Sequence, residues 1–105
     1  MKLWIDDVRP APEGGDWFWA LSVREAKYLI DEIEWDEYDD GEVIELIDID
    51  YDAGEFVSAG GDYIKLLEWL EETGRNYPIR IHSDNPVGVQ NMRRIIERNG
   101  WKEVF

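Results

Sequence analysis

The chain has 105 residues, which predicts one domain with a single modest core. Its net charge is -14, yet 44% of its residues are hydrophobic, which excludes a disordered acidic tail. This negative charge argues against broad nucleic-acid binding, but it permits a small phosphorylated ligand that is bridged by a divalent cation. The chain has no cysteine, which excludes disulfides and thiolate metal sites.

The first part of the chain predicts two strands and the start of a helix. Residues 2–5 are a short apolar strand, and residues 17–21 are an aromatic-rich one. Residues 9–15 between them contain two prolines and two glycines, which exclude a helix and predict an exposed loop. Ser22 and Glu25 then have the capping-box spacing that opens a helix.

The middle of the chain predicts the central strand and a second helix. The acidic stretch 35–42 is interpreted as a solvated connector, because its spacing fits no calcium loop. Residues 43–50 form the central strand, and residues 55–61 form a glycine-containing loop. Asp62 is expected to cap the helix predicted over residues 63–73.

The last part of the chain predicts a strand over 78–82, a helix over 86–99 and a strand over 101–105. Strand–helix alternation with short connections indicates a parallel sheet with right-handed crossovers. We therefore expect one α/β domain over residues 1–105: a three-layer, flavodoxin-like sandwich with a five-stranded sheet in the order 2-1-3-4-5. A Pro/Gly loop replaces its first helix.

Polar residues follow three of the predicted strands at the point where each ends. Asp6 and Asp7 follow the first strand, Asp50 and Asp52 end the central one, and His82 ends the fourth. Because parallel strands end at the same edge of a sheet, these side chains should converge where open α/β sheets bind ligands.

Converging carboxylates repel one another unless a cation neutralises them. Asp6, Asp7 and Asp50 are therefore candidate ligands of Mg²⁺ or Mn²⁺, with Asp48 behind them as a supporting or core polar residue. The alternative is that they are ordinary turn and capping aspartates.

Arg80 and His82 lie on one side of the fourth strand. An arginine inside a central parallel strand should be buried, so Arg80 is expected to pair with Glu45 or Asp50, or to hold a phosphate. His82, the only histidine, is either a hydrogen-bonded structural residue or an acid–base group.

Three further residues could hold a phosphate. Ser83 and Asn85 precede a helix amino terminus, which attracts anions, although either residue could simply cap the helix. Arg9, in the loop above the sheet, could close over a phosphate or remain a surface arginine.

Three motifs together resemble the cyclic-phosphate-processing receiver-like domains, relatives of response-regulator receivers. They are W-I-D-D-V-R-P-A-P at 4–12, D-Y-D-A-G at 50–54 and I-R-I-H-S-D-N-P-V-G at 79–88. The resemblance implies a receiver-like fold and action on cyclic phosphate ends of nucleotides or RNA. It also implies an active-site set of Asp6, Asp7, Asp50, Asp52 and His82.

One position departs from the family pattern, which usually has Asp-His-Asp where this chain has Asp50-Tyr51-Asp52. Tyrosine is a poor acid or base at neutral pH, because its ordinary pKa is near 10. A catalytically inactive, phosphate-binding module is therefore one alternative.

Phosphoacceptor receivers offer a second alternative. Under this hypothesis, Asp6 and Asp7 would bind Mg²⁺, Asp50 would accept the phosphoryl group, and Ser83 would stand at the end of the fourth strand. These receivers also need a lysine at the carboxyl end of the fifth strand, whereas Lys102 is expected near its start.

The leading hypothesis is a metal-dependent phosphoesterase acting on a small phosphorylated nucleotide or RNA end. Lys2 stands in an amino terminus without a long apolar run, so neither a signal peptide nor a membrane span is expected, and the default location is cytoplasmic. The sequence carries no indication of oligomeric state.

Overall fold

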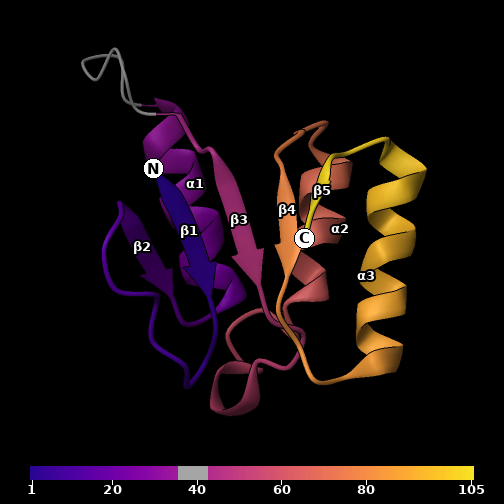
Figure 1. The fold of residues 1–105 in the computed structure, drawn as a ribbon, viewed down its shortest axis with the longest axis horizontal. Helices are drawn as coiled ribbons and strands as arrows, with labels where there is room; N and C mark the ends of the chain where they lie inside the picture. Colours follow the sequence, from indigo (N-terminus) through magenta and orange to yellow (C-terminus); the bar gives the residue numbers. More distant parts are fainter. Residues whose placement is uncertain (36–42) are drawn as a thin grey trace.

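The computed structural model describes residues 1–35 and 43–105, in which strands and helices alternate (Figure 1). The acidic connector expected over 35–42 lies, apart from its first residue, outside the described residues. The strands are β1 (Lys2–Ile5), β2 (Trp17–Ala20), β3 (Leu46–Ile49), β4 (Ile79–Ile81) and β5 (Glu103–Val104). The helices are α1 (Val23–Trp35), α2 (Ile64–Glu72) and α3 (Pro86–Asn99), with a short 3₁₀ helix η1 (Gly54–Phe56).

The five strands form one parallel sheet in the order β2-β1-β3-β4-β5. This confirms the predicted α/β class, the receiver-like architecture and the strand order. The register places Trp4 of β1 beside Asp48 of β3, and Asp48 beside Arg80 of β4.

The three helices cover one face of the sheet. Helix α1 connects β2 to β3, α2 connects β3 to β4, and α3 connects β4 to β5, so each connection moves toward the β5 edge of the sheet. Because such crossovers are right-handed, all three helices lie on the same face. Figure 1 shows α1 and α2 behind the strands. The described residues therefore form two layers rather than the expected three, because the loop over 9–15 takes the place of the helix that would cover the opposite face.

The core lies between the sheet and these helices. Burying an aliphatic side chain contributes about 1.5–3 kcal/mol, so this one layer of contacts supplies most of the hydrophobic stabilisation. Its largest fully buried side chains are Tyr63, Leu3, Ile5, Ile30, Ile47, Ile49, Leu66, Leu67, Leu70, Ile79, Met92 and Ile96. In the part of the chain that the structure describes, no helix has the length and apolar character needed to cross a membrane.

Local capping agrees with the sequence at α1 and differs at α2. The Glu25 backbone N–H donates to Ser22 Oγ at 3.0 Å, as the capping box predicts. The prediction that Asp62 caps α2 is wrong, because the residue at that position is Tyr63 and it makes no side-chain cap. Asp62 Oδ1 instead accepts a hydrogen bond from the Ala53 N–H at 3.0 Å, which holds the loop after β3.

Candidate functional site

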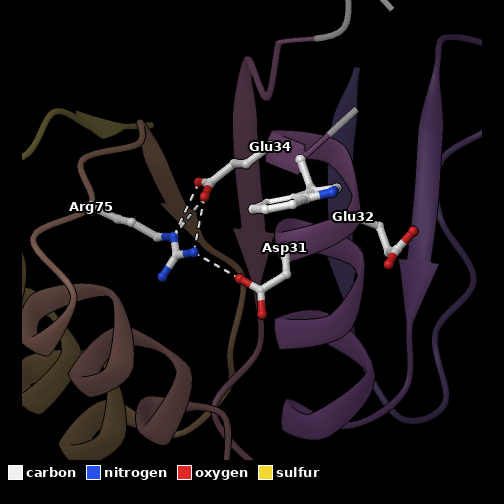
Figure 2. A pocket seen from close by; sticks show the side chains of 5 residues that line it. Asp31, Glu32, Glu34 and Arg75 are labelled. Carbon is white, nitrogen blue, oxygen red and sulfur yellow. Dashed lines mark hydrogen bonds and ion pairs between the residues drawn. The ribbon is translucent and has the colours of Figure 1, made fainter. Parts of the chain in front are cut away.

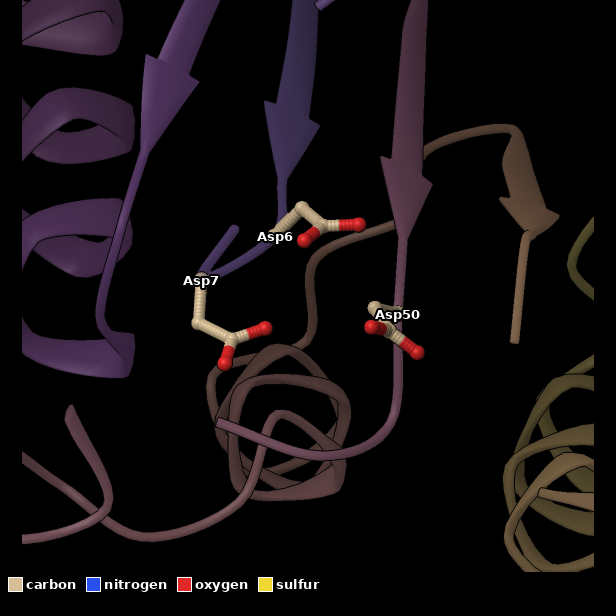
Figure 3. A group of neighbouring side chains, drawn as sticks. All are labelled: Asp6, Asp7 and Asp50. Carbon is tan, nitrogen blue, oxygen red and sulfur yellow. The ribbon is translucent and has the colours of Figure 1, made fainter. Parts of the chain in front are cut away.

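Three carboxylates meet at the carboxyl edge of the sheet. Asp6 and Asp7 follow β1, Asp50 follows the neighbouring β3, and one oxygen of each lies within 4.8 Å of the others (Figure 3). Asp6 is fully buried and Asp50 nearly so. We call these three residues the carboxylate group; its close packing of like charges needs a counter-charge.

Asp6 is held in place by hydrogen bonds. Its Oδ1 accepts from the N–H groups of Val8 at 2.9 Å and Arg9 at 2.8 Å, and its Oδ2 lies 3.0 Å from His82 Nε2. Burial alone would raise the pKa of Asp6, but the Arg9 and Val8 donors, together with His82, hold it below the ordinary value. Asp6 is thus kept as a carboxylate.

Asp50 has the opposite electrostatic environment. Burial raises its pKa, and the hydrogen bonds from the Tyr51 N–H at 2.7 Å and with the Ser83 side chain offset this only in part. The neighbouring Asp6 charge adds to the rise. Two adjacent carboxyls with pKa values moved apart are typical of sites that divide acid and base roles.

In EDTA at pH 7, Asp50→Asn is expected to be more stable than the unchanged protein. A raised folded-state pKa means that the stability Asp50 contributes is fully present below the unfolded pKa near 3.8 and is lost as the pH rises through the folded value. Asparagine stays uncharged, so the difference should vanish at about pH 3. Urea unfolding at both pH values measures this.

Asp84→Asn is the control, because that carboxylate is exposed and reaches only Arg9, at 3.9 Å. It should leave stability unchanged at both pH values. An Asp50→Asn variant less stable than the unchanged protein at pH 7 would contradict the electrostatic account.

The space beside Asp7 depends on a glycine. Gly54 has a φ of +54°, and a Cβ there would overlap the Asp7 carboxylate. The glycine therefore leaves room for Asp7 to face Asp6 and Asp50. Three converging carboxylates are the donor set that a hard divalent cation such as Mg²⁺ or Mn²⁺ prefers, so these residues fit a receiver-type metal site.

Arg9 lies over the carboxylate group. Its guanidinium is 3.4 Å from Asp6 Oδ2, 3.6 Å from Asp50 Oδ2 and 3.9 Å from Asp84 Oδ2. About half of the side chain is exposed. Arg9 is therefore the arginine nearest to the group among the described residues.

His82 reaches the same group from β4. Its Nδ1 lies 2.6 Å from Asp48 Oδ1, its Nε2 faces Asp6, and its ring stacks on Trp4 with centroids 3.9 Å apart. The side chain is 14% exposed. The expected convergence of His82 with the aspartates is therefore present in the geometry.

Arg80 differs from the expectation. Its nearest carboxylate is Asp48, with Nη1 to Oδ2 at 3.9 Å, rather than Glu45 or Asp50, and half of its side chain is exposed. The predicted burial is wrong because none of the helices in residues 1–35 and 43–105 covers this face of β4. The predicted partners are wrong because the register sets Arg80 beside Asp48.

Ser83 and Asn85 lie where β4 leads into α3. Asn85 caps the helix, with its Oδ1 accepting from the Gly88 N–H at 3.0 Å, and Ser83 Oγ accepts from the Asn85 N–H at 3.2 Å. Ser83 also bonds to Asp50. Both residues therefore lie at the edge of the site, where Asn85 caps the amino terminus of α3.

The side chains of Asp52 and Tyr51 are not part of the carboxylate group. Asp52 is exposed and is not among the three carboxylates that converge in the described chain. Tyr51 packs against the core, and a Cβ on Gly88 would overlap its ring. The position where the family usually has histidine is thus a packing position in this chain.

Two tryptophans hold the loop after β1, and sequence reasoning missed them. Trp4 Nε1 donates to the Arg9 carbonyl and Trp19 Nε1 to the Asp6 carbonyl, each at 2.7 Å. Alternation along β1 and β2 puts Trp4, Trp17 and Trp19 on the face without helices, which was the available signal. The site is therefore fixed by aromatic side chains from the open face.

A separate hollow of about 560 Å³ lies at the opposite edge of the sheet (Figure 2). Its Arg75 pairs with Asp31 at 2.7 Å and Glu34 at 2.9 Å, and Tyr77 also bonds to Glu34. Arg75 pairs with two of the three carboxylates that line the hollow, so the hollow is an ion-pair network with an excess of negative charge, and it ties α1 to the segment before β4. None of the motif residues lines it.

Comparison with known proteins identifies the family of the chain. A family model described as the cyclic-phosphate processing receiver domain matches residues 1–98. No curated protein and no solved structure matches the chain significantly. The match spans β1 to α3 and so includes the carboxylate group, Arg9 and His82. The chain belongs to the family of cyclic-phosphate processing receiver domains.

Proposed function

We propose that this domain is a metal-dependent phosphoesterase that opens a cyclic phosphate at the end of a nucleotide or RNA. The observation that carries the proposal is the contact of His82 Nε2 with Asp6 Oδ2 at 3.0 Å, inside the carboxylate group and beneath Arg9. This arrangement supports the proposal, because His82 as a proton-transfer group, Arg9 as an anion-binding cation and the carboxylates as metal ligands would then act at one point.

The carboxylates divide into cation ligands and a general base. Asp6, Asp7 and Asp50 would hold Mg²⁺ or Mn²⁺. When bound, this cation would polarise the phosphoryl oxygens and lower the pKa of a bound water. Two candidates remain for the base. Asp50 would act through a carboxylate oxygen that does not hold the cation, whereas Asp52 lies outside the group and would stay free when the others hold a cation.

The proposed reaction consumes one water. The water oxygen bonds to phosphorus, its proton passes to the Asp50 or Asp52 carboxylate, and one ring P–O bond breaks. The departing oxygen takes a proton from His82 Nε2, leaving a phosphomonoester and a free hydroxyl.

Phosphate binding is assigned to cations and polar groups around the carboxylates. Arg9 would hold the non-bridging oxygens, and Ser83 and Asn85 would present polar groups and the α3 amino terminus. Arg80, half exposed on the open face, would meet a more distant part of the ligand. The proposed ligand is small, in keeping with the net charge, and the proposed location is cytoplasmic.

The test is hydrolysis of 2′,3′-cyclic nucleotides and ADP-ribose cyclic phosphate with Mg²⁺ or Mn²⁺, with the phosphomonoester measured by chromatography. His82→Gln is expected to lower kcat by about 10²–10⁴-fold, the usual contribution of general acid–base catalysis. Asp84→Asn, with its exposed carboxylate, should retain turnover. No turnover above that of Asp50→Asn rejects the enzyme proposal.

A non-catalytic phosphate-binding module is the second candidate, favoured by Tyr51 packing against Gly88. It predicts thermal stabilisation by the cyclic phosphate with no product. Phosphoacceptor activity ranks below both, because Lys102 precedes β5 and so stands at the edge away from the carboxylate group. If incubation with acetyl phosphate and Mg²⁺ added the mass of one phosphoryl group to the intact protein, phosphoacceptor activity would become the leading hypothesis.

A further inference from the structure

The open face of the sheet carries three tryptophans next to the carboxylate group. Trp4 and Trp19 are neighbours in the register between β1 and β2, and Trp17 pairs with Lys2 further from the site. Side-chain alternation puts all three indoles on the face that the helices in residues 1–35 and 43–105 leave uncovered. We call these three residues the tryptophan cluster; aromatic surface beside a candidate site is a sign of ligand binding.

Trp19 is the member of the cluster that remains accessible. It is 39% exposed, whereas Trp4 packs edge-on to Trp17 with centroids 5.8 Å apart and stacks on His82. The one polar atom of the Trp19 side chain, Nε1, donates to the Asp6 carbonyl at 2.7 Å. The side chain therefore presents apolar indole surface to solvent, in an orientation that the hydrogen bond restrains.

The backbone after β1 joins the tryptophan cluster to the candidate site. The carbonyl of Asp6 accepts the Trp19 N–H, while the carboxylate of the same residue belongs to the carboxylate group. The carbonyl of Arg9 accepts the Trp4 N–H at 2.7 Å, while its guanidinium lies over the carboxylate group. A ligand whose phosphate is held at Arg9 therefore meets the Trp19 ring when it extends over the open face.

The charges beside the open face favour an anionic ligand. Arg9 and Arg80 lie on this side of the sheet, and each is about half exposed. The net charge of -14 opposes a second copy of the chain or an acidic protein at this face. A flat aromatic group attached to a phosphate suits both the indole and the arginines, and a nucleobase is such a group. Bases of every kind stack on tryptophan, because each has a π-face.

We propose that Trp19 stacks on the base of a nucleotide whose phosphate lies at the carboxylate group. The proposal rests on the proposed function and specifies its substrate class, because it requires the phosphate and the base to be on one ribose. A 2′,3′-cyclic nucleotide or the 3′ end of an RNA meets this requirement. ADP-ribose cyclic phosphate does not, since its cyclic phosphate is on the ribose that has no base.

The test measures binding by calorimetry in Mg²⁺, with adenosine 3′-monophosphate and glycerol 2-phosphate as probes. Neither probe is cyclic, so ring opening does not enter the measurement. Trp19→Leu is expected to weaken the binding of adenosine 3′-monophosphate by about tenfold or more, the usual effect of losing one stacked base, and to leave that of glycerol 2-phosphate unchanged. Trp35→Leu is the control and should change neither affinity, because Trp35 is 80% exposed and lines the hollow at the opposite edge of the sheet.

Trp19→Phe separates stacking from support of the loop. Phenylalanine keeps a ring but, like leucine, loses the N–H that holds the Asp6 carbonyl. It should therefore retain most of the affinity for adenosine 3′-monophosphate. The proposal is overturned by equal losses in Trp19→Phe and Trp19→Leu, by equal weakening of both probes, or by an unchanged affinity in Trp19→Leu. It is also overturned if the unchanged protein does not bind adenosine 3′-monophosphate.

The stacking role and the enzyme activity fail separately. Hydrolysis of 2′,3′-cyclic AMP with the same KM in Trp19→Leu and the unchanged protein would remove the stacking role and leave the proposed function standing. Selective loss of adenosine 3′-monophosphate binding in Trp19→Leu, without turnover of any cyclic phosphate, would keep the stacking role in a binding module.

Discussion

Mg²⁺ or Mn²⁺ at about one hundred times its dissociation constant is expected to raise Tm by about 10 °C or more. Binding to the folded state alone at that concentration stabilises by about 2.7 kcal/mol, and each kcal/mol moves Tm of a domain this small by about 4–8 °C. The cation also relieves the repulsion within the carboxylate group. Asp7→Asn and Asp50→Asn should abolish most of this shift in a thermal melt.

Asp52→Asn is the matched control, because it removes a neighbouring charge that lies outside the carboxylate group. It should keep the full shift. If Asp52→Asn and Asp50→Asn reduced the cation-induced rise in Tm equally, the cation would bind at a site other than the carboxylate group. Arg9 lies 3.6 Å from Asp50, so it competes for the same oxygens, and its displacement sets part of the affinity.

Gly88→Ala is expected to lower the free energy of unfolding by about 1–3 kcal/mol, the usual cost of overpacking. The new Cβ would overlap the ring of Tyr51, which packs across the first turn of α3. Helix propensity acts the other way, since alanine is favoured over glycine by about 1 kcal/mol. Urea denaturation measures the balance, and steric overlap should win.

The control for Gly88→Ala is the same change in a Tyr51→Ala background. With the ring removed, the substitution should become neutral or stabilising, so the double-mutant cycle should show coupling of about 2 kcal/mol. A loss of stability that is equal in both backgrounds would mean that the backbone, rather than the ring, requires glycine at this position.

The architecture could be predicted because its local signals agree with one another. The stripe of Val23, Ala26 and Ile30 has helical spacing, and all three side chains are buried in α1. Strand lengths were harder: the central strand was predicted over 43–50, but β3 pairs only over Leu46–Ile49, opposite the four residues of β1. Pairing partners, which decide strand ends, are not encoded locally.

The site could be predicted as far as the topology determines it. The carboxylates converge because the ends of β1 and β3 are neighbours in a parallel sheet. The contacts of Arg80 and Asp48 could not be predicted, because they depend on the register between β3 and β4 and on a face without helices. Each one-residue change in register would have given Arg80 a different neighbour.

The parallel pairing of β1 with β3 has a kinetic consequence. These strands are separated in the chain by β2 and α1, so the sheet closes through non-local contacts, which slows folding. Asp6, Asp50 and His82 sit on three strand ends and come together only when β4 has joined. A ligand that needs all three is expected to bind the complete sheet rather than the folding transition state, so it should lengthen the lifetime of the native state while leaving the refolding rate unchanged.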